Sequence, residues 1–158
     1  MRTEAEMRLH RCCFTGHRPE KLGRSEKEIK AELQREINQA VQVGFTVFIT
    51  GMARGVDLWA AQIVLDLRKR NKEIKLICAI PHEGFEARWS PSWQQLYRYV
   101  LTEADLTRVI SKGYHTGVYQ VRNEWMVNHS ARVIAVFNGQ PSGTKNTIDY
   151  AYRQGVPV

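Results

Sequence analysis

The sequence predicts a doubly wound parallel α/β sheet of five or six strands with helices on both faces. Short apolar runs alternate with segments of helical periodicity along the whole chain, which is typical of parallel strands joined by right-handed helical crossovers. The apolar runs are nearly continuous, which indicates a sheet covered on both faces. Three runs end at a small polar residue followed by glycine, and these pairs are Thr15-Gly16, Thr50-Gly51 and Asn138-Gly139.

The elements are predicted one after another from these patterns. Strands are expected at residues 11–15, 45–50, 74–80, 106–110 and 132–137, with Pro81 ending the third. A capping-box pattern at Ser25 to Glu28 opens a helix that runs to about residue 43. Further helices are expected at about 56–70, 92–104, 118–130 and 144–154, and a loop at 82–91. The residues after Gly155 are interpreted as the start of a sixth strand that is very short or cut off.

The composition is that of one globular domain over residues 1–158. The chain has 43% hydrophobic and 25% charged residues, enough to form a sizeable core. The first ten residues contain no apolar signal region and no run approaches a membrane span, so we expect a cytoplasmic protein without membrane association. The three cysteines fall on predicted strands and are interpreted as buried thiols, not disulfides. The histidines lack metal-ligand spacing with them, so no metal site is predicted.

The charge balance favours an anionic partner. The formal net charge is +7 and the isoelectric point is about 9.5, which fits a nucleotide or a nucleic acid. Much of this charge lies at residues 68–72, at the end of a predicted helix, where cations complement the negative helix terminus. That segment is therefore interpreted as a solvated helix end.

The glycine turns predict a ligand site at the carboxyl ends of the strands. Ligands of doubly wound sheets bind where the strand order reverses. With the order 3-2-1-4-5, the reversal falls between strands one and four, and Gly16, His17 and Arg18 lie at the centre. Glycine permits close backbone approach to an anion, and the helices that follow offer free N–H groups. We therefore expect a phosphorylated small molecule to bind here.

Together the motifs resemble the YpsA-like branch of the SLOG superfamily. This superfamily of Rossmann-like proteins also includes the DNA-processing protein DprA and the LOG phosphoribohydrolases. The resemblance extends over nearly the whole chain, and its motifs lie at residues 14–19, 51–61, 80–81, 88–90, 122–127 and 139–147. It implies a Rossmann-like fold and a pocket for a nucleotide or nucleotide derivative, of ADP-ribose or nucleotide-sugar type. It fixes neither a cofactor nor a reaction, so catalytic residues are unknown and the protein is a sensor or an enzyme.

The expected ligand-binding residues come from the three turns and from the helix after strand four. Asp57 either holds a ribose hydroxyl or caps its helix, and Arg122 either faces the ligand or pairs with a surface acid such as Glu124. Gly139 to Thr147 form the best candidate for a phosphate cradle. The full set is Thr15, Gly16, His17, Arg18, Thr50, Gly51, Ala53, Gly55, Asp57, Arg122, Asn123, Asn138, Gly139, Ser142, Gly143, Thr144 and Thr147.

Two alternative functions follow from the resemblance. A DprA-like module would bind single-stranded nucleic acid along a basic groove with stacking aromatic rings. A LOG-like phosphoribohydrolase is disfavoured, because Thr147 occupies the position where a catalytic glutamate is expected. Trp89 and Trp93 either stack on a base, form a dimer contact or pack in the core, and their four-residue spacing favours the core. A homo-oligomer is compatible with the sequence, which does not fix the oligomeric state.

Overall fold

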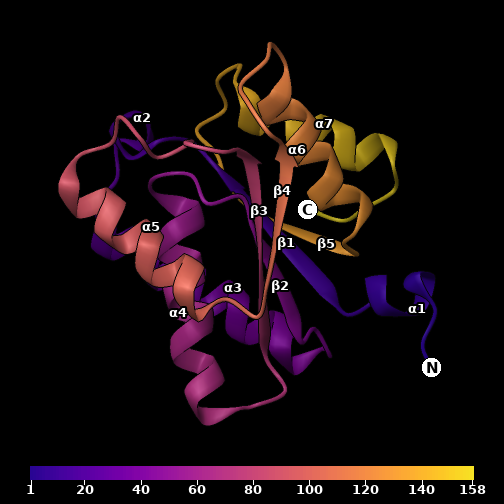
Figure 1. Ribbon diagram of the computed structural model, residues 1–158. Coiled ribbons are helices and arrows are strands. Elements are labelled where there is room, and N and C mark those ends of the chain that lie inside the picture. The colour runs from indigo at the N-terminus through magenta and orange to yellow at the C-terminus, as the bar shows by residue number, and fades with distance from the viewer.

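The computed structural model describes residues 1–158 and contains one parallel sheet of five strands in the order β4-β3-β2-β1-β5 (Figure 1). The strands are β1 (Arg11–Gly16), β2 (Val47–Thr50), β3 (Lys75–His82), β4 (Leu106–Ser111) and β5 (Arg132–Val136). The helices are α1 (Glu4–Arg8), α2 (Pro19–Leu22), α3 (Glu26–Gln42), α4 (Val56–Arg70), α5 (Pro91–Glu103), α6 (Val118–Asn128) and α7 (Gly143–Arg153). The predicted α/β fold with helices on both faces is confirmed.

The predicted strand order 3-2-1-4-5 is wrong in one respect. The fourth strand pairs with β3 at the edge of the sheet, and β5 takes the place beside β1. Apolar runs do not specify which neighbour a strand pairs with, because the packing of the crossover helices decides it. The reversal therefore falls between β1 and β5. Gly16, which pairs with Val136, still ends its strand at that point.

The sheet separates two hydrophobic clusters. The helices α3, α4 and α5 cover one face and α6 and α7 the other (Figure 1). Because side chains alternate along a strand, Cys12 lies in the larger cluster and its neighbour Cys13 in the smaller one. All three cysteines are buried and free, as predicted. Burial raises the pKa of Cys13 and Cys78 to about 12, so these thiols stay protonated.

Strand β3 differs from the prediction in where it ends, and strand β4 differs in its burial. Strand β3 continues through Pro81 to His82, because it pairs with β2 only as far as Cys78 and the proline there has a strand on one side only. Strand β4 is not covered on both faces. Its side chains Leu106 and Val109 are 58% and 42% exposed, so the apolar run belongs to an edge strand.

The two ends of the chain also differ from the prediction. The charged residues before β1 form the short helix α1, which the sequence analysis did not include. No sixth strand forms after Gly155, although the Val133 N–H donates to the Pro157 carbonyl at 2.8 Å. The sheet therefore has five strands, and the last residues lie beside β5 without extending it.

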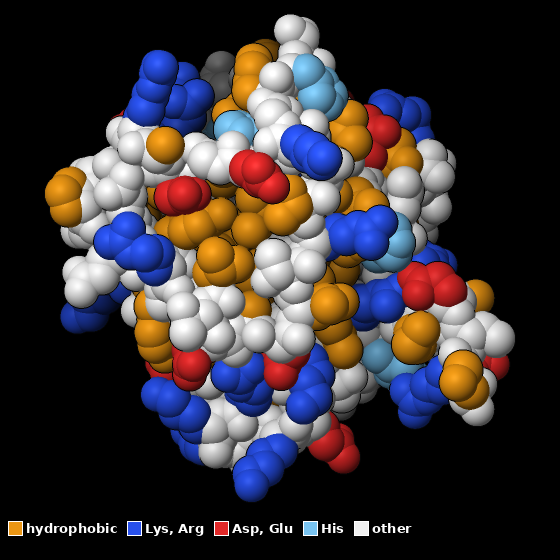
Figure 2. Space-filling view, in the orientation of Figure 1, with side chains coloured by type: hydrophobic (Ala, Val, Ile, Leu, Met, Phe, Trp, Pro, Cys, Tyr) orange, Lys and Arg blue, Asp and Glu red, His pale blue; other side chains and the backbone are white.

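The surface in the orientation of Figure 1 shows two kinds of patch. Hydrophobic side chains gather in the middle of this face, and Lys and Arg side chains gather along its lower border (Figure 2). Helix α4 ends in that lower region, and its last turn carries Arg68, Lys69 and Arg70. The carboxyl ends of the strands point the other way, toward α2 and the start of α7 (Figure 1). No helix here combines the length and the apolar character needed to cross a membrane.

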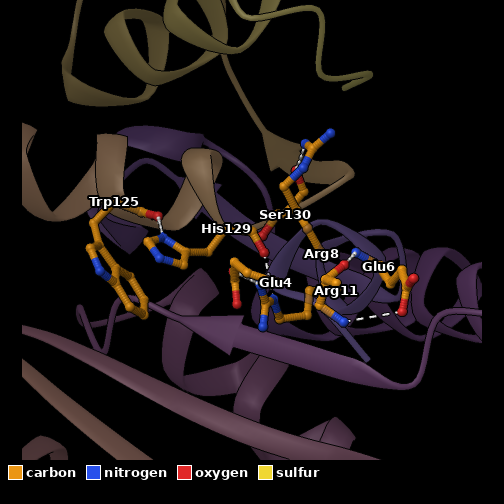
Figure 3. A network of polar contacts seen from close by, with 8 residues as sticks. Glu4, Glu6, Arg8, Arg11, Trp125, His129 and Ser130 are labelled. Atoms are coloured by element: carbon orange, nitrogen blue, oxygen red, sulfur yellow. Dashed lines mark hydrogen bonds and ion pairs between the residues drawn. The ribbon is translucent and has the colours of Figure 1, made fainter. Parts of the chain in front are cut away.

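A polar network ties the N-terminal segment to the end of α6 (Figure 3). Arg8 Nη1 donates to the Ser130 carbonyl at 2.7 Å, and Arg11 Nε donates to the His129 carbonyl at 2.6 Å. Arg11 also forms an ion pair with Glu4. Both carbonyls directly follow α6, where positive charge complements the negative helix terminus. The network thus fixes the end of α6, the helix whose first half reaches the carboxyl ends of the strands.

Candidate functional site

A cavity of about 1030 Å³ opens at the carboxyl ends of the strands. It lies beside the reversal in strand order, where β1 separates the β5–α7 connection from the start of α4. Residues of β1, α2, α6, the β2–α4 loop and the β3–α5 loop also line it. Three glycine turns that are far apart in the sequence therefore meet at one place, as the sequence analysis expected.

Two glycines of the site allow parts of the chain to pack against each other. A Cβ at Gly16 would lie 2.5 Å from the Val56 side chain, and a Cβ at Gly55 would lie 2.8 Å from Pro19. Gly55 also has φ +90°, a conformation that other residues rarely adopt. The end of β1 thus contacts the start of α4 without intervening side chains. Close approach here serves the frame of the cavity, and the predicted close approach to a ligand is not the role of these two glycines.

The β2–α4 loop is held by a small buried network. Thr50 Oγ1 donates to the Asp57 carbonyl at 2.9 Å and accepts from the Met52 N–H at 3.2 Å. The Ala53 N–H donates to Asp57 Oδ2 at 3.2 Å. Met52 has φ +65°, so the loop contains a strained residue that these contacts must hold. Asp57 thus organises the loop before its helix and does not cap the helix.

Asp57 is a buried acid that lines the cavity. Burial raises its pKa from 3.8 to about 6, against the opposing effects of the Arg122 charge and the hydrogen bond from Ala53. Its residue exposure is only 6%, and Oδ1 has no hydrogen-bond partner within the protein. The carboxylate therefore keeps an unused acceptor at the cavity wall. An acceptor of this kind suits a hydroxyl donor such as that of a ribose.

Arg122 is fixed by its neighbours and keeps spare donors. Nη1 donates to the Gly51 carbonyl and Nε donates to Asn123 Oδ1 at 2.7 Å. Burial lowers its pKa, and the negative charge of Asp57 opposes that effect. A Cβ at Gly51 would lie 3.1 Å from the guanidinium and 2.8 Å from Asp57 Oδ2, so only glycine leaves room for both. A guanidinium has more donors than these two acceptors use. Arg122 can thus also donate to a ligand, and it does not pair with Glu124.

His17 presents an unsatisfied polar atom at the site. It is 5% exposed, lies in the cavity wall and stacks on Phe137 with 5.3 Å between ring centroids. Its Nε2 is buried and has no hydrogen-bond partner. Burial, together with the charge of Lys21, lowers the pKa of His17, so the ring is neutral at pH 7. A buried polar atom without a partner costs stability unless a ligand or water satisfies it.

The β5–α7 connection supplies the start of a helix. The Ser142 hydroxyl accepts from the Lys145 N–H at 3.1 Å, and Ser142, Gly143 and Thr144 line the cavity. Asn138 Nδ2 donates to the Lys21 carbonyl at 2.9 Å, which ties this connection to α2. The first N–H groups of a helix attract anions. This side of the cavity is therefore suited to a phosphate.

Basic side chains surround the same side. Arg18 and Lys21 line the cavity and are exposed, and their side chains form no hydrogen bond or ion pair with the protein. Arg54 also lines it and pairs with Glu20 at 3.3 Å. Free cations beside a helix start add a second attraction for an anion. His, Cys, Asp and Glu side chains do not form a group that could hold a metal ion.

An aromatic wall lines the opposite side, and of its three residues the sequence pointed only to Trp89, as one of three alternatives. Phe85, Trp89 and Tyr119 line the cavity, with ring centroids 5.1 Å apart for Phe85 and Trp89 and 5.6 Å apart for Phe85 and Tyr119. The structure distinguishes the two tryptophans. Trp93 packs beside Trp59 at 5.8 Å on the outer side of α4, away from this cavity. The four-residue spacing of Trp89 and Trp93 does not predict this difference, because Trp89 lies in the β3–α5 loop and Trp93 in α5.

Most predicted residues meet at the cavity. Those that line it are Thr15, Gly16, His17, Arg18, Ala53, Asp57, Arg122, Asn123, Asn138, Ser142, Gly143 and Thr144. Those that do not are Thr50, Gly51, Gly55, Gly139 and Thr147. The first three of these hold the loop beneath the cavity. Gly139 is an exposed turn residue with φ +89°, and Thr147 is buried in α7, where its hydroxyl donates to the Gly143 carbonyl at 2.8 Å.

The comparison with known proteins identifies the family. Residues 12–155 match YpsA, described as the YspA SLOG family, so the chain belongs to this family. The uncharacterized SPbeta prophage-derived protein YoqJ of Bacillus subtilis (strain 168) is 35% identical over 116 residues, which cover 66% of this chain and 68% of that protein. A UPF0398 protein of Ligilactobacillus salivarius is 26% identical over 144 residues, which cover 86% of this chain and 78% of that protein.

Solved structures of DprA share the fold. The Helicobacter pylori protein, described in a study of its single-stranded DNA binding mode, superposes with a TM-score of 0.67 at 17% identity. The Streptococcus pneumoniae protein superposes with a TM-score of 0.63 at 18% identity. These matches cover 98% and 94% of this chain but only 65% and 49% of the two DprA chains. The shared fold thus extends over only part of each DprA chain.

Proposed function

We propose that this member of the YpsA SLOG family binds a nucleotide or nucleotide derivative, of ADP-ribose or nucleotide-sugar type, in the cavity at the carboxyl ends of its strands. One observation carries the proposal. A single cavity combines a helix start flanked by free cations, Arg18 and Lys21, with a buried carboxylate, Asp57, that has an unused acceptor oxygen. The helix start and its cations suit a phosphate, and the carboxylate suits a sugar hydroxyl.

The binding experiment uses a charge placed at the start of α7. A Cβ at Gly143 meets nothing within 4 Å, so Gly143→Asp adds a carboxylate to the cavity rim without a steric clash. We expect calorimetry to detect binding of ADP-ribose, NAD or a mononucleotide, and Gly143→Asp to abolish it. Gly143→Asn has the same shape without the charge and serves as the matched control. If none of these compounds binds in a manner sensitive to Gly143→Asp, the proposal is wrong.

A second candidate is binding of single-stranded nucleic acid, as described for the DprA of Helicobacter pylori. The cations Arg18 and Arg54 and the exposed Tyr119 line the cavity, and exposed Tyr114 packs beside Tyr119. They favour this candidate, since such binding needs stacking rings and phosphate contacts. This candidate predicts that the affinity decreases steeply as the salt concentration rises. Charge reversal at Arg18 or Arg54 would weaken binding and make that decrease less steep. A mononucleotide pocket would instead saturate with the small ligand.

The LOG-type reaction is less well supported. The residue that would replace its glutamate, Thr147, lies 1% exposed inside α7 and uses its hydroxyl within the helix. It therefore offers neither a carboxylate nor a free hydroxyl to the cavity. Free base released from a nucleoside monophosphate would be the product that revives this alternative.

A further inference from the structure

The aromatic wall of Phe85, Trp89 and Tyr119 assigns a subsite for a flat ring, and we propose that it binds the base of the nucleotide. This inference rests on the proposed function and names the part of the ligand that makes it specific. The wall lies in the β3–α5 loop and at the start of α6, whereas the helix start of α7 lies beyond β5. Two different chemistries thus occupy opposite sides of one cavity.

The sheet sets the distance between the two sides. From β5 through β1 and β2 to β3 there are three strand intervals in the observed order. At about 4.8 Å for each interval, they separate the α7 side from the β3 side by roughly 14 Å. A sugar phosphate held at the start of α7 is too short to reach the aromatic rings. A ligand that fills both sides therefore carries an anion at one end and a ring system at the other.

The rings are arranged to accept a further ring. The ring plane of Phe85 makes an angle of 71° with that of Trp89 and 59° with that of Tyr119. Phe85 therefore does not stack face to face on either ring. Phe85 and Trp89 are half-buried and Tyr119 is 43% exposed, which leaves ring surface toward the cavity. Stacking of a base on such rings is favourable for every base, because each has a π-face.

Arg122 extends the wall and fixes its position. The guanidinium carbon lies 5.7 Å from the Phe85 ring centroid and 6.0 Å from that of Tyr119. Since Arg122 is itself held by Gly51 and Asn123, two of the aromatic rings pack against a group that cannot easily move. The spare guanidinium donors border the same space and can reach ring nitrogens or carbonyl oxygens of a base. The subsite is therefore largely formed before a ligand binds.

The test compares AMP with ribose 5-phosphate, which lacks the base. We expect the protein to bind AMP at least roughly tenfold more tightly, and Tyr119→Ala to remove most of that difference while the affinity for ribose 5-phosphate stays the same. The unchanged affinity for ribose 5-phosphate would show that the phosphate and sugar side of the cavity is intact. Tyr152→Ala removes another exposed tyrosine, on α7 and outside the cavity, and should change neither affinity.

A spectroscopic measurement covers the case in which Tyr119→Ala fails to fold. AMP should quench tryptophan fluorescence in the wild type and ribose 5-phosphate should not, and Trp89→Phe should remove the quenching while AMP still binds. Equal affinities for AMP and ribose 5-phosphate, or equal losses of both in Tyr119→Ala, would overturn the base subsite and leave the proposed function standing. If AMP does not bind although ADP-ribose or NAD does, the base subsite is overturned as well, and if none of these compounds binds, the proposed function itself fails.

Discussion

The basic residues at the two ends of the sheet differ in whether they pair with other groups of the protein. At the amino ends, Arg68 pairs with Asp105 at 2.8 Å and donates to the Glu103 carbonyl, and Lys69 pairs with Asp66. At the carboxyl ends, Arg18 has no partner in the protein, and Arg122 is buried beside Asp57. Both ends are basic in sequence, but only the carboxyl ends leave charge unused around a cavity.

Whether a charged group has a partner within the protein therefore indicates a binding site better than the number of charges in a region does. At the amino ends the cations in the last turn of α4 complement its negative terminus, and Arg68 and Lys69 also pair with acids. The carboxyl-end groups are arranged at a cost: Met52 has a strained backbone, His17 Nε2 has no partner, and the pKa of Asp57 is raised. Local costs of this kind are typical of binding sites. Five substitutions, ordered by decreasing expected effect, test this contrast between the two ends.

Gly16→Ala should have the largest effect on stability. Its Cβ would overlap Val56, whose three nearest atoms lie 2.5 to 2.9 Å away, so β1 and α4 must move apart. We expect a loss of about 3 kcal/mol in the free energy of unfolding, measured with denaturant. Gly113→Ala, where a Cβ meets nothing within 4 Å, is the control and should change little. Equal stability of the two variants would contradict the tight frame of the cavity.

Asp57→Asn should stabilise the protein at neutral pH and weaken binding. The folded-state pKa of about 6 lies above the ordinary value, so the contribution of Asp57 to stability is complete below about pH 4 and is lost as the pH rises through 6. A neutral asparagine avoids that loss, which amounts to about 3 kcal/mol at a pH well above 6. Unfolding curves at pH 4 and pH 7.5 should therefore differ less in the variant.

The opposite sign is expected at the other end of the sheet. Asp105 accepts from Arg68 and from the Leu76 N–H at 2.9 Å, so Asp105→Asn should destabilise the protein by about 1 kcal/mol at pH 7.5. The affinity of the Asp105→Asn variant for AMP should equal that of the wild type. If both substitutions destabilise the protein equally, the buried carboxylate is structural and the contrast between the ends is lost.

Arg18→Gln should reduce the affinity for AMP without changing stability. The side chain is exposed and makes no contact that the fold requires, so its charge is available to the phosphate. Loss of one charge-assisted hydrogen bond predicts a roughly tenfold weaker binding by calorimetry. Arg70→Gln removes a cation at the end of α4 and should leave the affinity unchanged. A similar loss in both variants would mean that net charge alone attracts the anion.

Lys69→Gln should have the smallest effect. Its ion pair with Asp66 spans 3.5 Å between side chains that are 69% and 67% exposed. Pairs of this kind contribute little in water, so we expect a change below about 0.5 kcal/mol in the free energy of unfolding. A larger loss would show that the amino-end charges stabilise the fold more than their exposure suggests.

Much of the fold and of the site was predictable because both depend on local pattern. Strand ends and helix starts follow from apolar runs and caps, and parallel strands bring their carboxyl ends together. The glycine turns therefore converge, as expected from Gly16 and Gly143. The position of β4 and the role of Trp89 were not predictable, since an edge strand and a cavity wall use the same apolar residues as a core.

The sequence alone determined the alternation of strands and helices, the family, and the end of the sheet at which the glycine turns meet. Each of these depends on residues that are near one another in the chain or on motifs with fixed order. The tertiary structure alone decided that β5 lies beside β1 and that Gly16 contacts Val56. It also decided that Asp57 and Arg122 share one buried wall. These features arise from packing between distant segments, whose volumes and charges must fit together, and no local pattern records that fit.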